Sequence, residues 1–563
     1  MTIGHNNKRL GAEVLADMLA GYGVTHVFMV PAVLRRTFAE MERRTKIARV
    51  HCHGEKSAAY MADGYARASG KPGICMAQVI GALNLAAGLR DAWLAHSPVI
   101  AMTGGRDPKT KFRKVYQEID DMPAFEPVTK MNVTIDDVTR IPDMIRQAFR
   151  TATSGAPGPV HLQFRGNEGQ LDAEEGEMEG LVETQFAQVP PFRPEPEAER
   201  VKAALDLLQK AERPIFVVGG GVRASGAATE LTALAEALQI PVATSLNAKD
   251  CIPGTHELSV GVVGSYSRES ANLAVNRADL VCFIGTETGG MTTHFWAVPK
   301  IGTPAIQIDI EPESIGRNYP LQASVLGDAK KVLAAMLAQA DKASAKKRDG
   351  WIKEIGKLRA DWYAKYKSML EADVVPINPA RIVGELSKNV PDDAIVIVDT
   401  GHAGMWMGNM YDTRKPTQSY IRSAGHLGWA FCAGIGAKAA CPERPVIVFT
   451  GDAGFWYHIG EIETAVRWKI NSITIVNNNG GGNQSKRGFD RVYGGETDNR
   501  SRELWTYNPM NFAKLAEDMG AIGIRVEKPE DIAPALKKAL TADRPVVIDI
   551  ATDIEALAPT AVA

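Results

Sequence analysis

Residues 446–481 decide the fold, and they read VIVFTGDAGFWYHIGEIETAVRWKINSITIVNNNGG. Two continuous apolar runs, residues 446–449 and 473–476, predict buried strands, and the apolar positions between them recur at helical spacing. Continuous apolar strands that alternate with amphipathic helices are typical of parallel sheets covered on both faces. The stretch therefore predicts a strand–helix–strand unit of an α/β domain.

Polar side chains directly follow both predicted strands. Asp452 comes after the first strand, and Asn479, 27 positions later, comes after the second. In a right-handed crossover both strand ends lie at the same edge of the sheet, where ligands bind. A carboxylate and an amide oxygen suit Mg²⁺ or Ca²⁺, and the glycine-rich turn after Asp452 leaves backbone N–H groups free to hold a phosphate. The alternative is a pair of ordinary α/β turns.

The same alternation of strands and helices fills three stretches of the chain. We predict domains over residues 1–166, 199–340 and 376–555. The segment between the first two is rich in Glu and Pro, and the segment between the last two is charged with helical spacing, so both read as connections. We therefore expect three doubly wound α/β domains with parallel sheets.

The composition excludes several classes of protein. The 563 residues are 45% hydrophobic and 23% charged, which excludes disorder as the main state. A net charge of −2 argues against nucleic-acid and membrane-surface partners. No apolar run is long enough to span a membrane, the first residues lack the apolar core of a secretory signal, and the six cysteines include no Cys-x-x-Cys pair. We expect a cytoplasmic protein with reduced cysteines.

Residues 451–481 resemble the diphosphate and metal signature of thiamine diphosphate enzymes, a Gly-Asp-Gly turn followed at similar spacing by Asn-Asn. The resemblance implies Mg²⁺ as the metal and three metal ligands: Asp452, Asn479 and the backbone carbonyl of Gly481. It places the cofactor diphosphate against a turn that includes Gly451, Ala453 and Gly454. Ala453 departs from the family, which usually has Gly there, so the turn has less conformational freedom.

Other motifs extend the resemblance to the acetolactate synthase branch of that family. Residues 53–67, HGEKSAAYMADGYAR, are similar to its pyrimidine-domain segment. The resemblance implies that Glu55 shares a proton with N1′ of the cofactor's aminopyrimidine, which helps to activate the thiazolium ring. Gln117 lies in a segment similar to the Phe-Gln-Glu of these synthases and is a substrate-side candidate. Alone, Glu55 would be read as a surface carboxylate at a strand end, and Gln117 could equally belong to an ordinary surface turn.

Two further segments resemble loops that line the cofactor. Residues 425–429 are similar to the stretch that bends the cofactor into a V shape, with Leu427 as the wedge and the Gly425 carbonyl as acceptor for the 4′-amino group. Residues 401–406 correspond to another lining loop, whose cofactor-binding candidates are Gly401, His402, Gly404 and Met405. Without the resemblance, a single Leu at such a position would be interpreted as an ordinary hydrophobic core residue.

The middle stretch resembles the family's central domain through residues 219–222 and 308–312. Relatives use that domain for FAD, for ADP or for no ligand. Flavin-binding synthases have an arginine-containing segment where this chain has residues 286–291, which contain no arginine. FAD is therefore not expected, and CoA substrates lose support for the same reason.

We predict a thiamine diphosphate- and Mg²⁺-dependent enzyme, an acetolactate synthase-like carboligase that acts on 2-oxo acids or aldehydes. A decarboxylase of the 2-oxo acid or oxalyl-CoA type and a 2-hydroxyacyl-CoA type lyase are the alternatives. An inactive regulatory homologue is disfavoured because Glu55, Asp452 and Asn479 are all present. Relatives build each site from two subunits, so the resemblance implies a homodimer or homotetramer with shared active sites.

Overall fold

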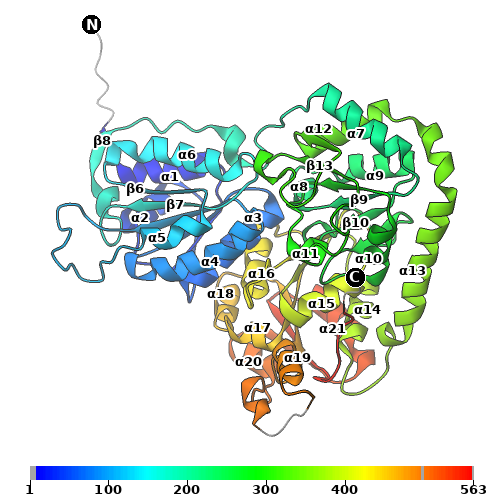
Figure 1. Ribbon diagram of the computed structural model, residues 1–563. Helices are drawn as coiled ribbons and strands as arrows, with labels where there is room; N and C mark the ends of the chain where they lie inside the picture. Colours follow the sequence, from blue (N-terminus) through cyan, green and yellow to red (C-terminus); the bar gives the residue numbers. More distant parts are fainter. Residues whose placement is uncertain (1–7, 496–499, 561–563) are drawn as a thin grey trace.

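Three six-stranded sheets, each wholly parallel, form the body of the molecule, and helices surround each sheet (Figure 1). The structure is a computed structural model and describes residues 8–495 and 500–560. The prediction of three parallel α/β domains is confirmed. None of the helices within these ranges is long and apolar enough to cross a membrane.

The N-terminal sheet has the strand order β3-β2-β4-β5-β7-β6. Its strands are β2 (His26–Met29), β3 (Ala48–His51), β4 (Gly73–Ala77), β5 (Val99–Gly104), β6 (Met131–Ile135) and β7 (Val160–Phe164). The helices are α1 (Gly11–Gly21), α2 (Arg35–Arg44), α3 (Glu55–Ser69), α4 (Ala82–Leu94), α5 (Met122–Phe125) and α6 (Ile141–Thr153). Every residue of β4, β5 and β7 is buried, as strands covered on both faces require. The short strands β1 (Lys8–Leu10) and β8 (Glu175–Glu177) pair antiparallel beside this sheet.

The central sheet has the order β11-β10-β9-β12-β13-β14. Its strands are β9 (Pro214–Val218), β10 (Val242–Thr244), β11 (Ser259–Val262), β12 (Leu280–Ile284), β13 (Ala305–Asp309) and β14 (Ala323–Leu326). The helices are α7 (Ala198–Lys210), α8 (Gly220–Ala224), α9 (Ala228–Leu238), α10 (Glu269–Arg277), α11 (Gly290–Thr293) and α12 (Ala329–Gln339). The long helix α13 (Asp349–Leu370) runs down the outside of this domain to the last one (Figure 1).

The C-terminal sheet has the order β16-β15-β17-β18-β20-β19. Its strands are β15 (Ile395–Val398), β16 (Ser419–Arg422), β17 (Val446–Gly451), β18 (Ile473–Asn478), β19 (Ile522–Val526) and β20 (Val546–Ala551). The helices are α14 (Pro379–Asn389), α15 (Gly401–Met410), α16 (Trp429–Ala440), α17 (Asp452–Trp456), α18 (Glu461–Arg467), α19 (Asn483–Val492), α20 (Phe512–Asp518) and α21 (Ile532–Leu540). Strands β17 and β18 are direct neighbours, so their carboxyl ends lie side by side.

The first and last domains share one hydrophobic core where α3 crosses α16 (Figure 1). The helices touch through their backbones: a Cβ on Gly64 would lie 2.0 Å from the Ala433 carbonyl oxygen, and a Cβ on Gly436 would lie 1.8 Å from that of Met61. Only glycine fits at these two positions, because any side chain would push the helices apart.

Candidate active site

The ends of β17 and β18 bring Asp452 and Asn479 together at one edge of the C-terminal sheet. One carboxylate oxygen of Asp452 accepts hydrogen bonds from the N–H groups of Gly480 (2.7 Å) and Gly481 (3.1 Å), and the other accepts from Ala453 (2.8 Å). The amide oxygen of Asn479 also accepts from the Gly481 N–H, at 3.2 Å. The two strand ends therefore bring these acceptor oxygens together at one edge of the sheet, as the crossover predicted.

This cluster fits a divalent cation. Asp452 is only 3% exposed, yet its partners are backbone N–H groups rather than cations. Burial raises the pKa of Asp452 to about 6, against the opposing effect of those backbone groups. No cluster of three or more His, Cys, Asp or Glu side chains suited to a metal lies in the described part of the chain. A metal here would depend on one carboxylate together with amide and carbonyl oxygens, and it would supply the missing positive charge.

The turn beside Asp452, where the sequence predicts a diphosphate, is open on one side. A Cβ added to Gly451 would meet no atom within 4 Å, whereas a Cβ on Gly454 would lie 2.6 Å from a carboxylate oxygen of Asp399. The turn is thus open at Gly451 and closely packed at Gly454. Ala453 keeps its backbone N–H, which is bonded to Asp452, so its methyl group does not disturb the turn.

Asp399 ties three of the predicted cofactor segments together. Its carboxylate accepts from the N–H groups of Thr400 (2.8 Å) and Gly428 (3.1 and 3.2 Å) and from the Thr450 hydroxyl (2.9 Å). Thr400 directly precedes Gly401, and Gly428 directly follows Leu427. Thr450 lies two residues before Asp452. Asp399 is fully buried, and burial raises its pKa to about 7.

The loop between β16 and α16 is held from the N-terminal domain. Asp91 of α4 accepts from the N–H groups of Ala424 (2.9 Å) and His426 (3.1 Å) and from the Ser423 hydroxyl (2.9 Å). The same carboxylate receives Arg67 of α3 at 2.7 Å, and Arg67 also donates to the Arg422 carbonyl at 2.8 Å. This contact fixes the backbone on which Gly425 and Leu427 lie.

Gly425 and Leu427 are the accessible part of that loop. Gly425 is exposed and has a φ of 149°, a conformation that favours glycine, and Leu427 is half-buried. His426 between them is bonded to the Tyr60 hydroxyl of α3. The structure thus presents the predicted wedge and carbonyl on an exposed turn.

The segment that begins at Gly401 is more deeply buried than the turn at Gly425. Gly401 begins α15 with a φ of 69°, and Gly404 packs on the Asp399 backbone. His402 accepts from the Ala558 N–H at 3.0 Å, and burial, helped by the charge of Arg487 on α19, lowers its pKa to about 4. Met405 is 8% exposed and belongs to the core of the domain. His402 is therefore neutral, and most of the Met405 side chain is buried in the core.

Glu55 and Gln117 lie at the carboxyl edge of the N-terminal sheet. Glu55 begins α3 and accepts from the Asn84 side chain at 3.1 Å, while Gln117 accepts from the Gln78 side chain at 3.0 Å. Gly81 makes room for the carboxylate, since a Cβ there would lie 2.4 Å from a Glu55 oxygen. The segments after β3, β4 and β5 thus gather both residues at one edge.

Glu55 does not face the C-terminal domain of its own chain. Contacts of α3 with that domain include Ser57, which bonds to His458 at 2.9 Å, Tyr60, which bonds to His426, and Asp63, which receives the Trp429 indole N–H at 2.8 Å. Ser57 and Tyr60 lie roughly 160° and 140° around the helix from Glu55, so Glu55 lies largely on the face of α3 opposite these two contacts. The structure therefore brings Asp452, Asn479 and Gly425 into one domain edge but leaves Glu55 at another.

Sequence reasoning missed the residues that hold these loops. Asp399 carries the same signal as Asp452, because it directly follows an apolar strand, residues 395–398. Asp91 carries no local signal, and Arg67 only ends the motif at residues 53–67. The packing of the two domains alone reveals that both meet the loop after β16.

Three parallel α/β domains, the last with a buried Asp beside an Asn at adjoining strand ends, define the thiamine diphosphate-binding class of enzymes. Comparison with protein families assigns each of the three domains to the same class of enzymes. Residues 9–124 match the thiamine pyrophosphate enzyme N-terminal TPP binding domain, residues 201–336 its central domain and residues 399–550 its C-terminal TPP binding domain. The chain belongs to the thiamine pyrophosphate enzyme family.

Curated relatives are similar over nearly the whole chain. A probable acetolactate synthase large subunit of Methanocaldococcus jannaschii is 33% identical, over 96% of this chain and 92% of that protein. An acetolactate synthase large subunit of Corynebacterium glutamicum is 32% identical, over 96% and 86% respectively. A glyoxylate carboligase of Escherichia coli O157:H7 is 31% identical, over 96% and 93%. The predicted resemblance to the acetolactate synthase branch is confirmed.

Proposed function

We propose that this protein is a thiamine diphosphate- and Mg²⁺-dependent carboligase that joins a 2-oxo acid, after loss of CO₂, to a second carbonyl compound. The observation that carries the proposal is the buried, cation-free carboxylate of Asp452 beside Asn479 at two adjoining strand ends. The similarity to acetolactate synthases and to a glyoxylate carboligase supports ligation over simple cleavage.

Asp452, Asn479 and the Gly481 carbonyl would hold the metal, and the open turn at Gly451, with Ala453 and Gly454, would hold the diphosphate. Gly425 and Leu427 would orient the aminopyrimidine, together with the helix start at Gly401, His402, Gly404 and Met405. When bound, the cofactor supplies a nucleophilic carbon that adds to carbonyl groups. The protein fixes that carbon against the substrate and excludes water.

Glu55 would hold a proton at N1′ of the aminopyrimidine. Its carboxylate is already oriented by Asn84 and needs no rearrangement of its own domain. Gln117 would face the substrate from the same edge. On the other side, Arg487 of α19 lies near His402, and we propose that it pairs with the carboxylate of the 2-oxo acid.

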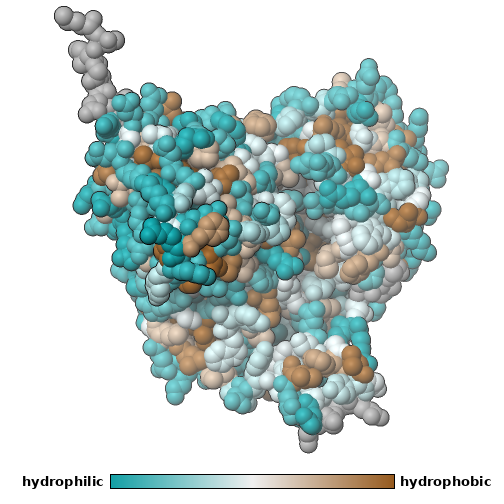
Figure 2. Space-filling model, turned by 60° about the vertical axis from the view of Figure 1, so that its left-hand side comes forward, coloured by the Kyte–Doolittle hydropathy of each residue, from teal (hydrophilic) through white to brown (hydrophobic). Residues whose placement is uncertain are grey.

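We propose a homodimer or homotetramer in which each site is shared. Glu55 is turned away from the loops of its own chain, so a second copy would have to present its own Gly425 and Asp452 to it. Hydrophobic residues gather at several places on the face shown in Figure 2. Exposed ones include Phe112, Tyr116 and Ile119, in the segment that carries Gln117, and Val492 and Leu504 in the C-terminal domain. A partner that covers them would remove apolar surface from water.

The remaining sequence predictions stay proposals. They are functional domains over residues 1–166, 199–340 and 376–555, a cytoplasmic location, small-molecule partners only and no flavin. Flavin would show as a yellow preparation with a visible absorption band.

The test is a panel of 2-oxo acids and aldehydes with the purified protein, thiamine diphosphate and Mg²⁺, with products identified by NMR. A new carbon–carbon bond with release of CO₂ supports the proposal. Release of a free aldehyde alone would identify a decarboxylase, and cleavage of acyloins or 2-hydroxyacyl-CoA compounds would identify a lyase. A protein that binds the cofactor and turns over none of these compounds would contradict the carboligase.

A further inference from the structure

A left-handed turn in the central domain presents two large aromatic side chains to solvent. His294, Phe295 and Trp296 follow α11 with φ angles of 48°, 54° and 64°. Bulky residues rarely adopt this left-handed region, because their Cβ atoms crowd the backbone, and here three do so in succession. Phe295 is 68% exposed and Trp296 is 43% exposed, so burial of their rings offsets little of that strain. A strained backbone that holds exposed rings in place favours a binding role.

Hydrogen bonds within the segment hold the turn in this conformation. The Phe295 N–H donates to the Gly290 carbonyl at 2.7 Å. The Trp296 N–H donates to the Thr293 hydroxyl at 3.0 Å, and that hydroxyl donates in turn to the Gly289 carbonyl at 3.1 Å. Thr293 is fully buried, so this anchor is shielded from water. The backbone that carries the two rings is therefore fixed before any ligand arrives, as a preorganised binding surface requires.

The segment around the turn carries apolar rather than charged side chains. Residues 288–299 contain no Asp, Glu, Lys or Arg. Met291 and Ile301, both exposed, are further apolar side chains of this part of the chain. Folding leaves these side chains and the two aromatic rings in water, although removal of each from water is favourable. The segment therefore suits an apolar group of a ligand better than a charged one.

The turn is connected to α15, whose first residues would line the cofactor. The His294 imidazole forms a hydrogen bond with the Ser265 hydroxyl at 3.2 Å, and the Ser265 N–H donates to the Met291 carbonyl at 2.8 Å. The next residue, Tyr266, packs on α15, because a Cβ added to Gly404 would lie 3.6 Å from its ring. The turn therefore adjoins the proposed active site through Ser265 and Tyr266.

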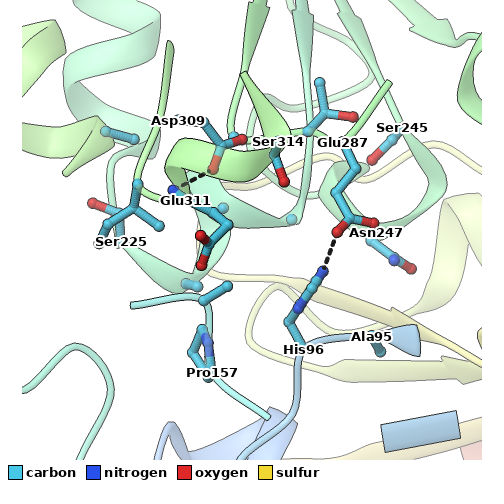
Figure 3. Close-up of a pocket in the computed structure, with 18 of the residues that line it drawn as sticks. Ala95, His96, Pro157, Ser225, Ser245, Asn247, Glu287, Asp309, Glu311 and Ser314 are labelled. Atoms are coloured by element: carbon cyan, nitrogen blue, oxygen red, sulfur yellow. Dashed lines mark hydrogen bonds and ion pairs between the residues drawn. The ribbon is translucent and has the colours of Figure 1, made fainter. Parts of the chain in front are cut away.

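A cavity at the carboxyl ends of the central strands borders the same segment. Figure 3 shows charged side chains along that cavity, among them Asp309 and Glu287, the second of which pairs with His96. Within the described residues, the lining of the cavity follows the segment after β12 only as far as Thr292. The two aromatic rings of the turn therefore belong to a separate surface.

We propose that Phe295 and Trp296 form an apolar subsite of the proposed active site and bind the aromatic or long aliphatic group of a carbonyl substrate. The inference rests on the proposed function, because it names the class of 2-oxo acid or aldehyde that the carboligase takes. The substituent lies against the two rings, and the carbonyl group extends toward α15 and the cofactor. A larger substituent buries more apolar surface against the rings, so affinity should rise with its size.

Calorimetric titration of the holoenzyme, loaded with thiamine diphosphate and Mg²⁺, tests binding with probes that cannot react. 3-Phenylpropionate against propionate is the arm for a 2-oxo acid, and benzyl alcohol against ethanol is the arm for an aldehyde. We expect at least one aromatic probe to bind with a Kd in the millimolar range or tighter, and at least tenfold more tightly than its aliphatic control. If neither aromatic probe binds at concentrations up to about 10 mM, or neither shows that preference, the proposal fails.

Phe295→Ala and Trp296→Ala test the rings, with Phe192→Ala, at an exposed Phe of the segment between the first two domains, as matched control. Each of the first two variants should weaken binding of the aromatic probe about tenfold, and Phe192→Ala should not change it. Without ligand, Phe295→Gly should melt at or above the wild-type temperature, because glycine adopts a φ of 54° without strain.

Two results with these variants would overturn the proposal. A lower melting temperature combined with unchanged probe affinity would make the two rings structural. A change in association state combined with unchanged probe affinity would make the turn an interface between copies of the chain.

Turnover separates this inference from the proposed function. Trp296→Ala should lower the ratio of kcat/KM for an aromatic substrate to that for its small analogue at least tenfold, with benzaldehyde against acetaldehyde or phenylpyruvate against pyruvate as the pair. If ligation occurs, the ratio is unchanged and the probes do not bind, the inference fails and the carboligase stands. If no pair of compounds is ligated while probe binding still depends on Trp296, the proposed function fails and the apolar binding surface stands.

Discussion

Replacement of Asp91 by Asn should damage stability and cofactor binding together. The Asp91 carboxylate is fully buried and serves Arg67 on one side and the N–H groups of Ala424 and His426 on the other. Asn preserves the shape but has one acceptor oxygen instead of two and no charge. At least one loop donor would then face an NH₂ group, and Arg67 would retain only Asp63 as its counter-ion.

The expected loss of folding stability depends on the ion pair that Arg67 keeps with Asp63. Loss of one partner from a buried ion pair costs about 3–5 kcal/mol, and because Arg67 keeps Asp63, we expect a value near 3 kcal/mol. A domain stability of about 5–15 kcal/mol survives that loss, so the variant should fold. The relaxed loop would present Gly425 and Leu427 less well, and we expect cofactor affinity to fall about tenfold, equivalent to about 1.4 kcal/mol.

Urea denaturation and calorimetric titration of thiamine diphosphate at saturating Mg²⁺ measure the two effects. Asp63→Asn is the matched control, because Asp63 is equally buried and shares Arg67 but accepts no hydrogen bond from residues 423–428, the loop after β16. It should lose similar stability and keep nearly all its cofactor affinity. If Asp91→Asn behaves like Asp63→Asn in both assays, the contact from α4 does not position the loop and the reasoning fails.

Glu55→Gln should keep the cofactor affinity and slow exchange of the cofactor's thiazolium proton by about 10²–10⁴-fold, measured by quenched NMR in D₂O; unchanged exchange would remove Glu55 from the mechanism. Asp452→Ala should weaken Mg²⁺ and cofactor binding jointly, and calorimetry with wild-type affinity and metal dependence would disprove its role as a ligand. Mixing inactive Glu55→Ala chains with inactive Asp452→Ala chains should restore activity, because one site per dimer becomes intact; no recovery after proven subunit exchange would contradict a shared site. Burial raises the pKa of Asp399 from its usual 3.8 to about 7. Between these two pH values the folded chain keeps a proton on Asp399 that the unfolded chain releases. The stability of the cofactor-free protein should therefore fall as the pH rises from about 4 to 7, by up to about 4 kcal/mol, and level off above that window. Denaturation at several pH values measures this, and an Asp399→Asn variant with the same pH slope would exclude Asp399 as its source.

The sequence was most informative where a residue's role is local. The apolar runs on both sides of Asp452 required parallel strands, and the crossover rule then placed Asp452 and Asn479 at one edge, where the structure has them. The same rule gathered Glu55 and Gln117 at the N-terminal edge. These are consequences of strand direction, which apolar pattern and turn residues determine.

What the sequence could not supply is the packing of one domain on another. Met405 occupies a motif position that implies a cofactor contact, and only the packing of its domain reveals that 8% of the residue remains exposed. Arg422 and Asp91 show no pattern at all, because their environment is assembled from residues hundreds of positions away. The direction of Glu55 likewise follows from which face of α3 meets α16, and helical periodicity alone does not specify that partner.

The crossing of α3 and α16 has a consequence for biosynthesis. Gly64 packs on Ala433 and Gly436 packs on Met61, although the whole central domain lies between the two helices in the sequence. At about 5–20 residues per second, a ribosome needs on the order of 20–70 s to extend the chain from the first glycine to the second. During that interval the newly made N-terminal domain displays the small, apolar face of α3 with nothing to cover it. Yield in the cell should accordingly depend on chaperones that act before translation ends, and slower translation of residues 200–430 should increase aggregation instead of relieving it.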